Sequence, residues 1–183
     1  MKQYMWFHPS YVAETSEITV EGQKENARKH GYIVLGEKEL GKVRSWDHLT
    51  IVGHSTAPQS SSSDSSSEND CGLYIQGDTA DECYTRLRYS GLRVPPKVLS
   101  LECCHAAIDG GIAETLSAHK FFKTSLVEAN PSGVGRNPET VVWSGFLLDK
   151  FGRAVMFHGE YDWVFMRGGG ERKSPNTRMG VTA

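Results

Sequence analysis

Short apolar runs and amphipathic stretches alternate along this chain. Apolar runs bounded by glycine, proline or polar residues predict strands within 5–13, 31–36, 48–55, 72–77, 95–104 and 123–131. Helical periodicity and end signals predict helices at 17–31, 79–91 and 110–122. The second helix would begin at Thr79, whose capping-box partner Glu82 lies three residues later. The apolar stretch 139–159 fits either a strand or a helix.

Strands and helices alternate in the order expected of an α/β fold. We therefore predict a mainly parallel sheet flanked by helices on both faces. Residues 59–70, QSSSSDSSSEND, contain seven serines and three acidic residues but no apolar residue. Because such a segment can bury nothing, we predict a disordered loop at 58–70 within a single domain of residues 1–167. The glycine-rich, polar residues 168–183 are expected to form a flexible tail.

Two of the predicted strands end in residues that could act together in catalysis. His54 follows LTIVG, and Cys104 ends VLSLECC fifty residues later. Chemistry in parallel α/β sheets collects at the carboxyl ends of strands, and an imidazole is suited to take the proton of a thiol nucleophile. Strand alternation groups Cys103 with Leu99 and Leu101, so Cys103 is expected in the core and Cys104 at the strand tip. Either residue alone is more often structural, and only their joint placement favours catalysis.

The order of these elements resembles that of the caspase-like cysteine peptidases. LTIVGHS, the serine-rich loop, GLYIQG, TADECYTRLRYSGL and KVLSLECCHA follow the family's order of strand with histidine, variable loop, short strand, helix, and strand with cysteine. The self-processing cysteine protease domains of large bacterial toxins are closest in pattern. The resemblance covers about residues 45–130 and implies a caspase-like fold and an endopeptidase with a His54–Cys104 dyad.

The resemblance also implies an oxyanion hole and a substrate site. Backbone N–H groups of Ser55 and Cys104 would bind the oxyanion, although the family usually has glycine where Ser55 stands. Serine suits this position only if the backbone does not require a positive φ. Candidate contacts to a protein or peptide substrate are Trp143, Glu102 and Ala129.

Further roles follow from the same resemblance. The family needs no third catalytic residue, but Asp47 or Asp78 could orient the imidazole. No cofactor and no metal are expected. A bacterial effector or a toxin-derived protease is implied, and a small-molecule activator would be a further partner.

Three alternatives compete with the cysteine peptidase. GHSTA resembles the nucleophile elbow of serine hydrolases, with Ser55 as nucleophile, but the serine-rich segment cannot be the helix that must follow an elbow. A catalytically degenerate caspase-like module would bind a partner without turnover. A metal site at Cys103, Cys104 and His105 is disfavoured because consecutive residues do not readily converge on one ion.

Composition and charge narrow the partners and the location. A net charge of −2 provides no basic field for nucleic acid. No stretch approaches the roughly 20 apolar residues of a membrane span, and MKQYMWFHPSY lacks the apolar block of a secretory signal. The four cysteines, Cys71, Cys83, Cys103 and Cys104, are expected to be free thiols. We therefore predict a cytoplasmic protein, or one secreted into a host cell without a cleavable signal peptide.

Overall fold

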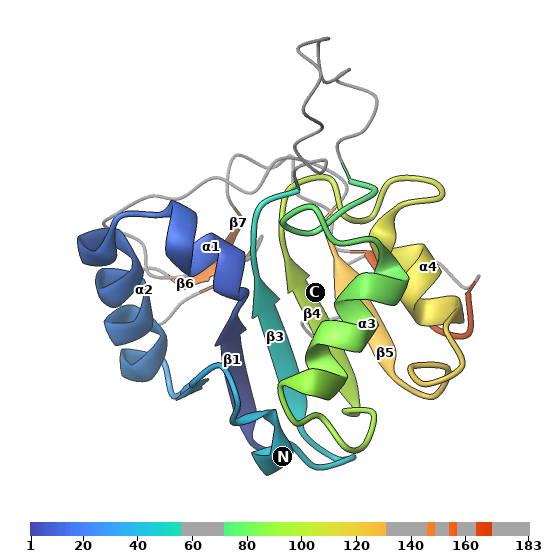
Figure 1. Cartoon of the computed structure of the whole chain (residues 1–183), viewed down its shortest axis with the longest axis horizontal. Coiled ribbons are helices and arrows are strands. Elements are labelled where there is room, and N and C mark those ends of the chain that lie inside the picture. Colours follow the sequence, from blue (N-terminus) through green and yellow to red (C-terminus); the bar gives the residue numbers. More distant parts are fainter. Residues whose placement is uncertain (56–71, 131–145, 149–153, 157–163, 170–183) are drawn as a thin grey trace, which may run out of the picture.

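Six strands form one sheet in the computed structural model, which describes residues 1–55, 72–130, 146–148, 154–156 and 164–169. The strands are β1 (Gln3–Phe7), β2 (Ile33–Leu35), β3 (His48–Val52), β4 (Val98–Glu102), β5 (Leu126–Ala129) and β8 (Val164–Met166). They lie in the order β2-β1-β3-β4-β5-β8, and the first five are parallel (Figure 1). Strand β8 pairs antiparallel with β5. The predicted α/β fold with a mainly parallel sheet is therefore confirmed.

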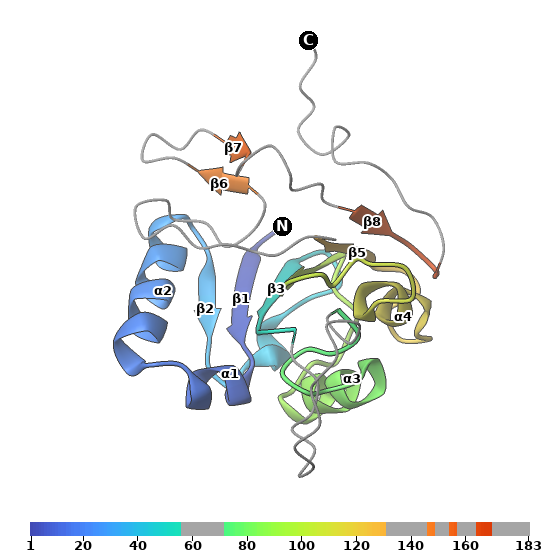
Figure 2. The same cartoon turned by 90° about the horizontal axis from the view of Figure 1, so that it is seen from above.

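Helices cover both faces of this sheet. They are α1 (Pro9–Glu14), α2 (Glu17–Lys29), α3 (Ala80–Tyr89) and α4 (Ile112–Ala118), with a short 3-10 turn at Leu40–Lys42. Figure 2 shows α3 and α4 on the same side of the sheet, and α2 beside β2. Helix α3 begins with the predicted capping box, because the Thr79 side chain accepts the backbone N–H of Glu82 and the Glu82 carboxylate accepts that of Thr79.

Two apolar clusters lie on opposite faces of the sheet. Tyr4 and Trp6 of β1 belong to the large cluster that includes residues of α3 and α4. Met5 and Phe7 alternate with them and belong to a second cluster that includes Val20 of α2. Because successive residues of a strand point to opposite faces, this division of β1 shows that both faces are packed.

The first strand is shorter in the structure than the range predicted from the sequence. Of the predicted range 5–13, only the part up to Phe7 belongs to β1, which begins earlier at Gln3. His8 then caps α1, since its Nδ1 accepts the backbone N–H of Ser10 at 3.3 Å. Pro9 occupies the first turn of α1, where its missing N–H costs nothing.

The prediction of a strand at 72–77 is wrong. This segment has a single isolated bridge between Ile75 and Asp78, with Gln76 and Gly77 both at positive φ between them. The turn packs on the end of β3, because a Cβ at Gly53 would lie only 2.9 Å from Cγ1 of Ile75. Ile75 of GLYIQG therefore packs a turn against the sheet, whereas Leu73 is exposed, and the segment does not extend the sheet.

Other sequence expectations fall at the end of the chain. The stretch 139–159 contains an antiparallel pair, β6 (Phe146–Leu148) with β7 (Ala154–Met156), and β8 had no counterpart among the predicted elements. The predicted loop at 58–70 and most of the predicted tail at 168–183 lie outside the described residues. Within the part of the chain that the structure describes, no helix is long and apolar enough to cross a membrane.

Candidate active site at the carboxyl edge of the sheet

The register of β3 and β4 brings His54 and Cys104 to the carboxyl ends of two neighbouring central strands, which we call the carboxyl edge of the sheet. Val52 and Glu102 are register partners at the ends of these neighbouring parallel strands. The backbone N–H of Gly53 donates to the carbonyl of Glu102 at 3.3 Å, so the pairing continues past the last residue of β3. His54 and Cys104 each lie two residues beyond these partners. Both therefore stand at the carboxyl edge, on adjacent strands.

Gly72 packs against the segments that follow both strands. Its backbone N–H donates to Oγ of Ser55 at 2.5 Å. On its other side, a Cβ at this position would lie 2.2 Å from the carbonyl oxygen of His105, and its φ is +96°. No other amino acid would fit this contact without backbone movement. Gly72 therefore ties the residue after His54 to the residue after Cys104.

His54 is exposed, and its surroundings fix its backbone and one side of its ring. The imidazole ring lies against the ring of Tyr11, with centroids 4.9 Å apart. Tyr11 is fully buried, and its hydroxyl hydrogen-bonds the Gln23 carboxamide at 2.9–3.0 Å. One edge of His54 is therefore supported by a rigid aromatic residue of α1.

Gln76 holds the peptide groups of His54 from both sides. The carboxamide oxygen of Gln76 accepts the N–H of His54 at 2.5 Å, and the N–H of Gln76 donates to the carbonyl of His54 at 2.7 Å. The carboxamide nitrogen donates to Glu14 at 2.9 Å. Gln76 is 8 % exposed and adopts a φ of +51°, an uncommon conformation for a residue with a side chain. We call the hydrogen bonds between Gln76 and His54 the Gln76 clamp.

The three described cysteines differ in their access to solvent. Cys83 and Cys103 are each 1 % exposed, whereas Cys104 is partly exposed. Burial, with a smaller contribution from the charge of Asp78, raises the pKa of Cys83 to about 12. Burial and the neighbouring Cys104 raise the pKa of Cys103 well above its usual range. Cys103 lies in the core as the strand alternation predicted, so Cys104 is the described thiol best placed to react.

The two carboxylates that were expected to orient the His54 ring are engaged by other residues. Asp78 accepts from the buried His8 ring at 3.0 Å and from Arg86 at 2.5 and 2.8 Å. Burial alone would raise the pKa of Asp78, but the hydrogen bonds from Arg86 and His8 lower it to about 2. Asp47 lies at the opposite edge, where it accepts the backbone N–H groups of Lys2 and Arg44.

The remaining predicted residues have varied positions. The positive-φ residues other than glycine are Gln76 and His105 among the described residues, so Ser55 does not need the conformation that favours glycine. Glu102 is 5 % exposed, and Ala129 is fully buried in the large apolar cluster, so the structure does not expose Ala129 to a substrate. Trp143 and Cys71 lie outside the described residues.

A second group of polar side chains on the sheet was not predicted from the sequence. His48 Nε2 lies 2.5 Å from Ser100 Oγ, the Ser100 hydroxyl donates to Glu128, and all three side chains are buried. The acid here meets the same ring nitrogen as the serine, at 3.4 Å, whereas a hydrolase triad uses the opposite nitrogen. In the sequence, these three residues are polar positions within three separate apolar runs. Their contact could not be inferred until the register of the strands was known. This group is a buried network inside the sheet.

The carboxyl ends of β3 and β4 bring together a thiol and an imidazole. Among the described residues, no group of three or more histidine, cysteine, aspartate or glutamate side chains could hold a metal ion. No protein-family model matches the chain, and a comparison with curated proteins finds no significant match. The class that fold and site define is therefore an α/β protein with a thiol and an imidazole on adjacent strand ends.

Proposed function

We propose that this chain is a cysteine endopeptidase of the caspase-like type, with Cys104 as nucleophile and His54 as its proton acceptor. The observation that carries the proposal is the register of β3 and β4, which aligns a partly exposed thiol with an exposed imidazole at one sheet edge. The burial of Cys83 and Cys103 adds support, because it leaves Cys104 as the accessible thiol among those described. A protein or peptide is the substrate, and the chain would act in a cytoplasm, its own or that of a host cell.

The proposed mechanism uses the thiol twice, first as nucleophile and then as leaving group. His54 accepts the proton of Cys104 while Sγ attacks the scissile carbonyl carbon, and the oxyanion is stabilised by the backbone N–H groups of Ser55 and Cys104. His54 then protonates the leaving amine as the C–N bond breaks, which leaves a thioester on Sγ. Water, deprotonated by His54, attacks the thioester, and collapse releases the carboxylic acid and restores the thiol.

The geometry of Ser55 favours this mechanism over its rivals. Because Ser55 does not adopt a positive φ, a serine at this position does not by itself distort an oxyanion hole. Ser55 is 7 % exposed, and its hydroxyl oxygen accepts the N–H of Gly72. A buried hydroxyl held in this way is poorly presented for nucleophilic attack, which disfavours the serine hydrolase alternative.

Native thiol labelling tests the proposal directly. In a Cys71→Ser background, iodoacetamide at neutral pH should label Cys104 first, while Cys83 and Cys103 should stay unmodified because burial raises the pKa of both thiols. His54→Ala should slow labelling of Cys104 by roughly an order of magnitude, because the group that takes the thiol proton is lost. Peptide mapping by mass spectrometry identifies each site, and His119→Ala is the control for loss of an imidazole elsewhere.

Two outcomes would count against the enzyme. Labelling of Cys104 that is no faster than that of an unfolded cysteine peptide, and unchanged by His54→Ala, would leave a caspase-like binding module as the better description. Labelling of Cys103 ahead of Cys104 would contradict the assignment of the nucleophile.

The Gln76 clamp gives a second test of the site. Gln76→Ala removes the acceptor for the N–H of His54, so we expect kcat to fall roughly ten- to a hundredfold while KM changes little, because His54 is misplaced but substrate contacts remain. Glu14→Gln is the matched control, since it keeps an oxygen that can accept from the Gln76 carboxamide. Equal losses in both variants, or an unchanged kcat in Gln76→Ala, would show that the clamp does not position His54.

A further inference from the structure

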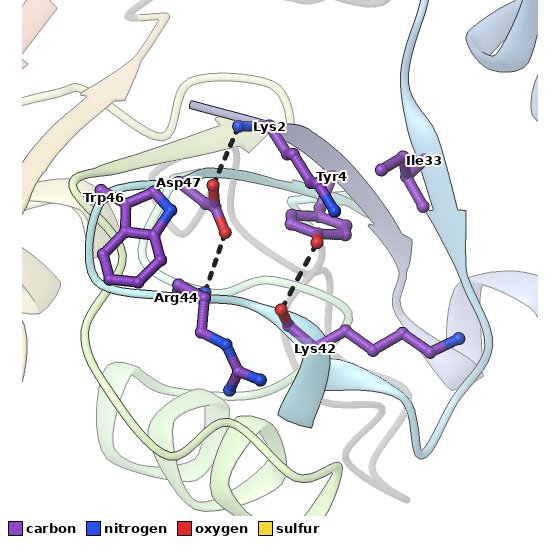
Figure 3. A pocket seen from close by; sticks show the side chains of 7 residues that line it. All are labelled: Lys2, Tyr4, Ile33, Lys42, Arg44, Trp46 and Asp47. Carbon is purple, nitrogen blue, oxygen red and sulfur yellow. Dashed lines mark hydrogen bonds between the residues drawn. The ribbon is translucent and has the colours of Figure 1, made fainter.

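A pocket of about 490 Å³ lies at the amino ends of the strands, at the opposite end of the sheet from His54 and Cys104. It is formed around the amino ends of β1, β2 and β3 (Figure 3). Its lining includes Lys2, Tyr4, Ile33, Arg44, Trp46 and Asp47. The volume is in the range of small-molecule sites. Nothing in the proposed peptidase mechanism uses this pocket.

The charge balance of the pocket is positive. Its carboxylate, Asp47, is 1 % exposed and directs its two oxygens to the backbone N–H groups of Lys2 at 2.8 Å and Arg44 at 3.0 Å. Lys42 also lines the pocket, but its ammonium pairs with Glu39 outside it. Neither the Lys2 nor the Arg44 side chain has an ion pair with a described carboxylate, and the Arg44 guanidinium donates only to the carbonyl of Gly41, at 3.3 Å. Two cations are therefore available to a ligand.

Apolar side chains flank these cations. Trp46 is 61 % exposed and Ile33 is 40 % exposed, which is unusual for side chains of this size. Figure 3 shows the Trp46 indole at one end of the pocket and Ile33 at the other, with Lys2 and Tyr4 between them. The pocket therefore combines an exposed indole, which can stack on an aromatic ligand, with a guanidinium, which can bind an anion.

We propose that this pocket binds a small aromatic phosphate of the nucleoside monophosphate class. The base would stack on Trp46, and the phosphate would be attracted by the charges of Lys2 and Arg44, both of which line the pocket. A single nucleotide is favoured over a nucleic acid strand because the net charge of −2 provides no basic field along which a strand could lie. This binding is independent of the His54–Cys104 chemistry.

Isothermal titration of the full chain with adenosine monophosphate tests the proposal. Arg44→Ala and Trp46→Ala should each weaken binding about tenfold, since one removes a charge-assisted contact and the other the stacking surface. Arg44→Ala keeps the backbone N–H that Asp47 accepts, and Trp46 is largely exposed, so both variants should fold. Lys29→Ala, an exposed ion-pair residue on α2, is the charge-matched control and should bind as the parent does. A circular dichroism melt checks folding of each variant.

Separate titrations with adenosine and with inorganic phosphate distinguish the contribution of the base from that of the phosphate. We expect each to bind more weakly than adenosine monophosphate by at least about tenfold. The proposal is overturned if adenosine monophosphate gives no binding at millimolar concentration, or if Arg44→Ala and Trp46→Ala bind it as tightly as Lys29→Ala. Phosphate alone binding as tightly as the nucleotide would overturn the role of Trp46 and the aromatic part of the ligand.

Discussion

Replacing Cys104 with alanine is expected to reduce peptide-bond cleavage by a thousandfold or more, to the level of background hydrolysis, because no other described thiol can reach a substrate. Cys103→Ala should keep most of the activity, since the Cys103 side chain points into the large apolar cluster. The two substitutions remove the same atom from neighbouring positions. Their contrast therefore separates a nucleophile from a core thiol.

The cleavage assay can begin before any substrate has been identified. A proteome digested into peptides is incubated with each variant, and new termini are identified by mass spectrometry. Cleavage sites that appear with the parent and Cys103→Ala but not with Cys104→Ala would then define a substrate for kcat/KM determination. Cys103→Ala should be destabilised by about 1 kcal/mol because it leaves a small cavity. An inactive, folded Cys103→Ala with an active Cys104→Ala would refute the assignment.

Removing the Asp78 carboxylate is expected to destabilise the fold more than any other single change discussed for this edge. Asp78→Ala leaves the buried His8 ring and the Arg86 guanidinium without their shared acceptor, which should cost about 3 kcal/mol of the free energy of unfolding. Asp78 joins the end of β1 to α3 through these two partners. Denaturant unfolding at neutral pH measures the loss.

The same carboxylate gives stability a defined pH dependence. The pKa of Asp78 falls from its ordinary value of 3.8 to about 2 on folding, so its contribution is complete above 3.8 and is lost as the pH falls through about 2. Because the group is partly solvated, we expect this contribution to be about 1 to 2 kcal/mol. The stability difference between the parent and Asp78→Asn should therefore shrink between neutral pH and pH 2.

A neighbouring carboxylate serves as the control for this pH effect. Asp81 lies at the start of α3 but its side chain is 89 % exposed. Asp81→Asn should leave both the stability and its pH dependence nearly unchanged. A pH-independent difference between the parent and Asp78→Asn would show that the ion pair with Arg86 and His8 does not stabilise the folded state.

Much of the sheet could be read from the sequence, because the apolar runs of β3, β4 and β5 and the capping box of α3 are local signals. Alternation along one strand was enough to separate Cys103 from Cys104. The Gln76 clamp was not predictable, since a glutamine in an apolar run gives no local sign that the run is a turn. His8 was likewise hidden inside a run that looked like one strand, and its partner Asp78 lies 70 residues away.

The three unpredicted contacts share a physical cause. The Gln76 clamp, the His8–Asp78 pair and the buried His48–Ser100 contact all join residues that are distant in the sequence. Sequence periodicity reports which face a residue takes, but not which residue of another element meets it. Register and topology had to be known before these polar residues could be paired.

The contact of Gly72 with Ser55 belongs to a wider division of the chain into two halves, residues 1–55 and 72–130. The Gly53–Glu102 hydrogen bond, the His8–Asp78 pair and the Gln76 clamp all cross the same division. The first half carries His54 and the second carries Cys104, so neither half alone contains the proposed dyad. The two residues are thus brought together by docking between two sequence halves, and a backbone break between the halves would leave them held together by noncovalent contacts.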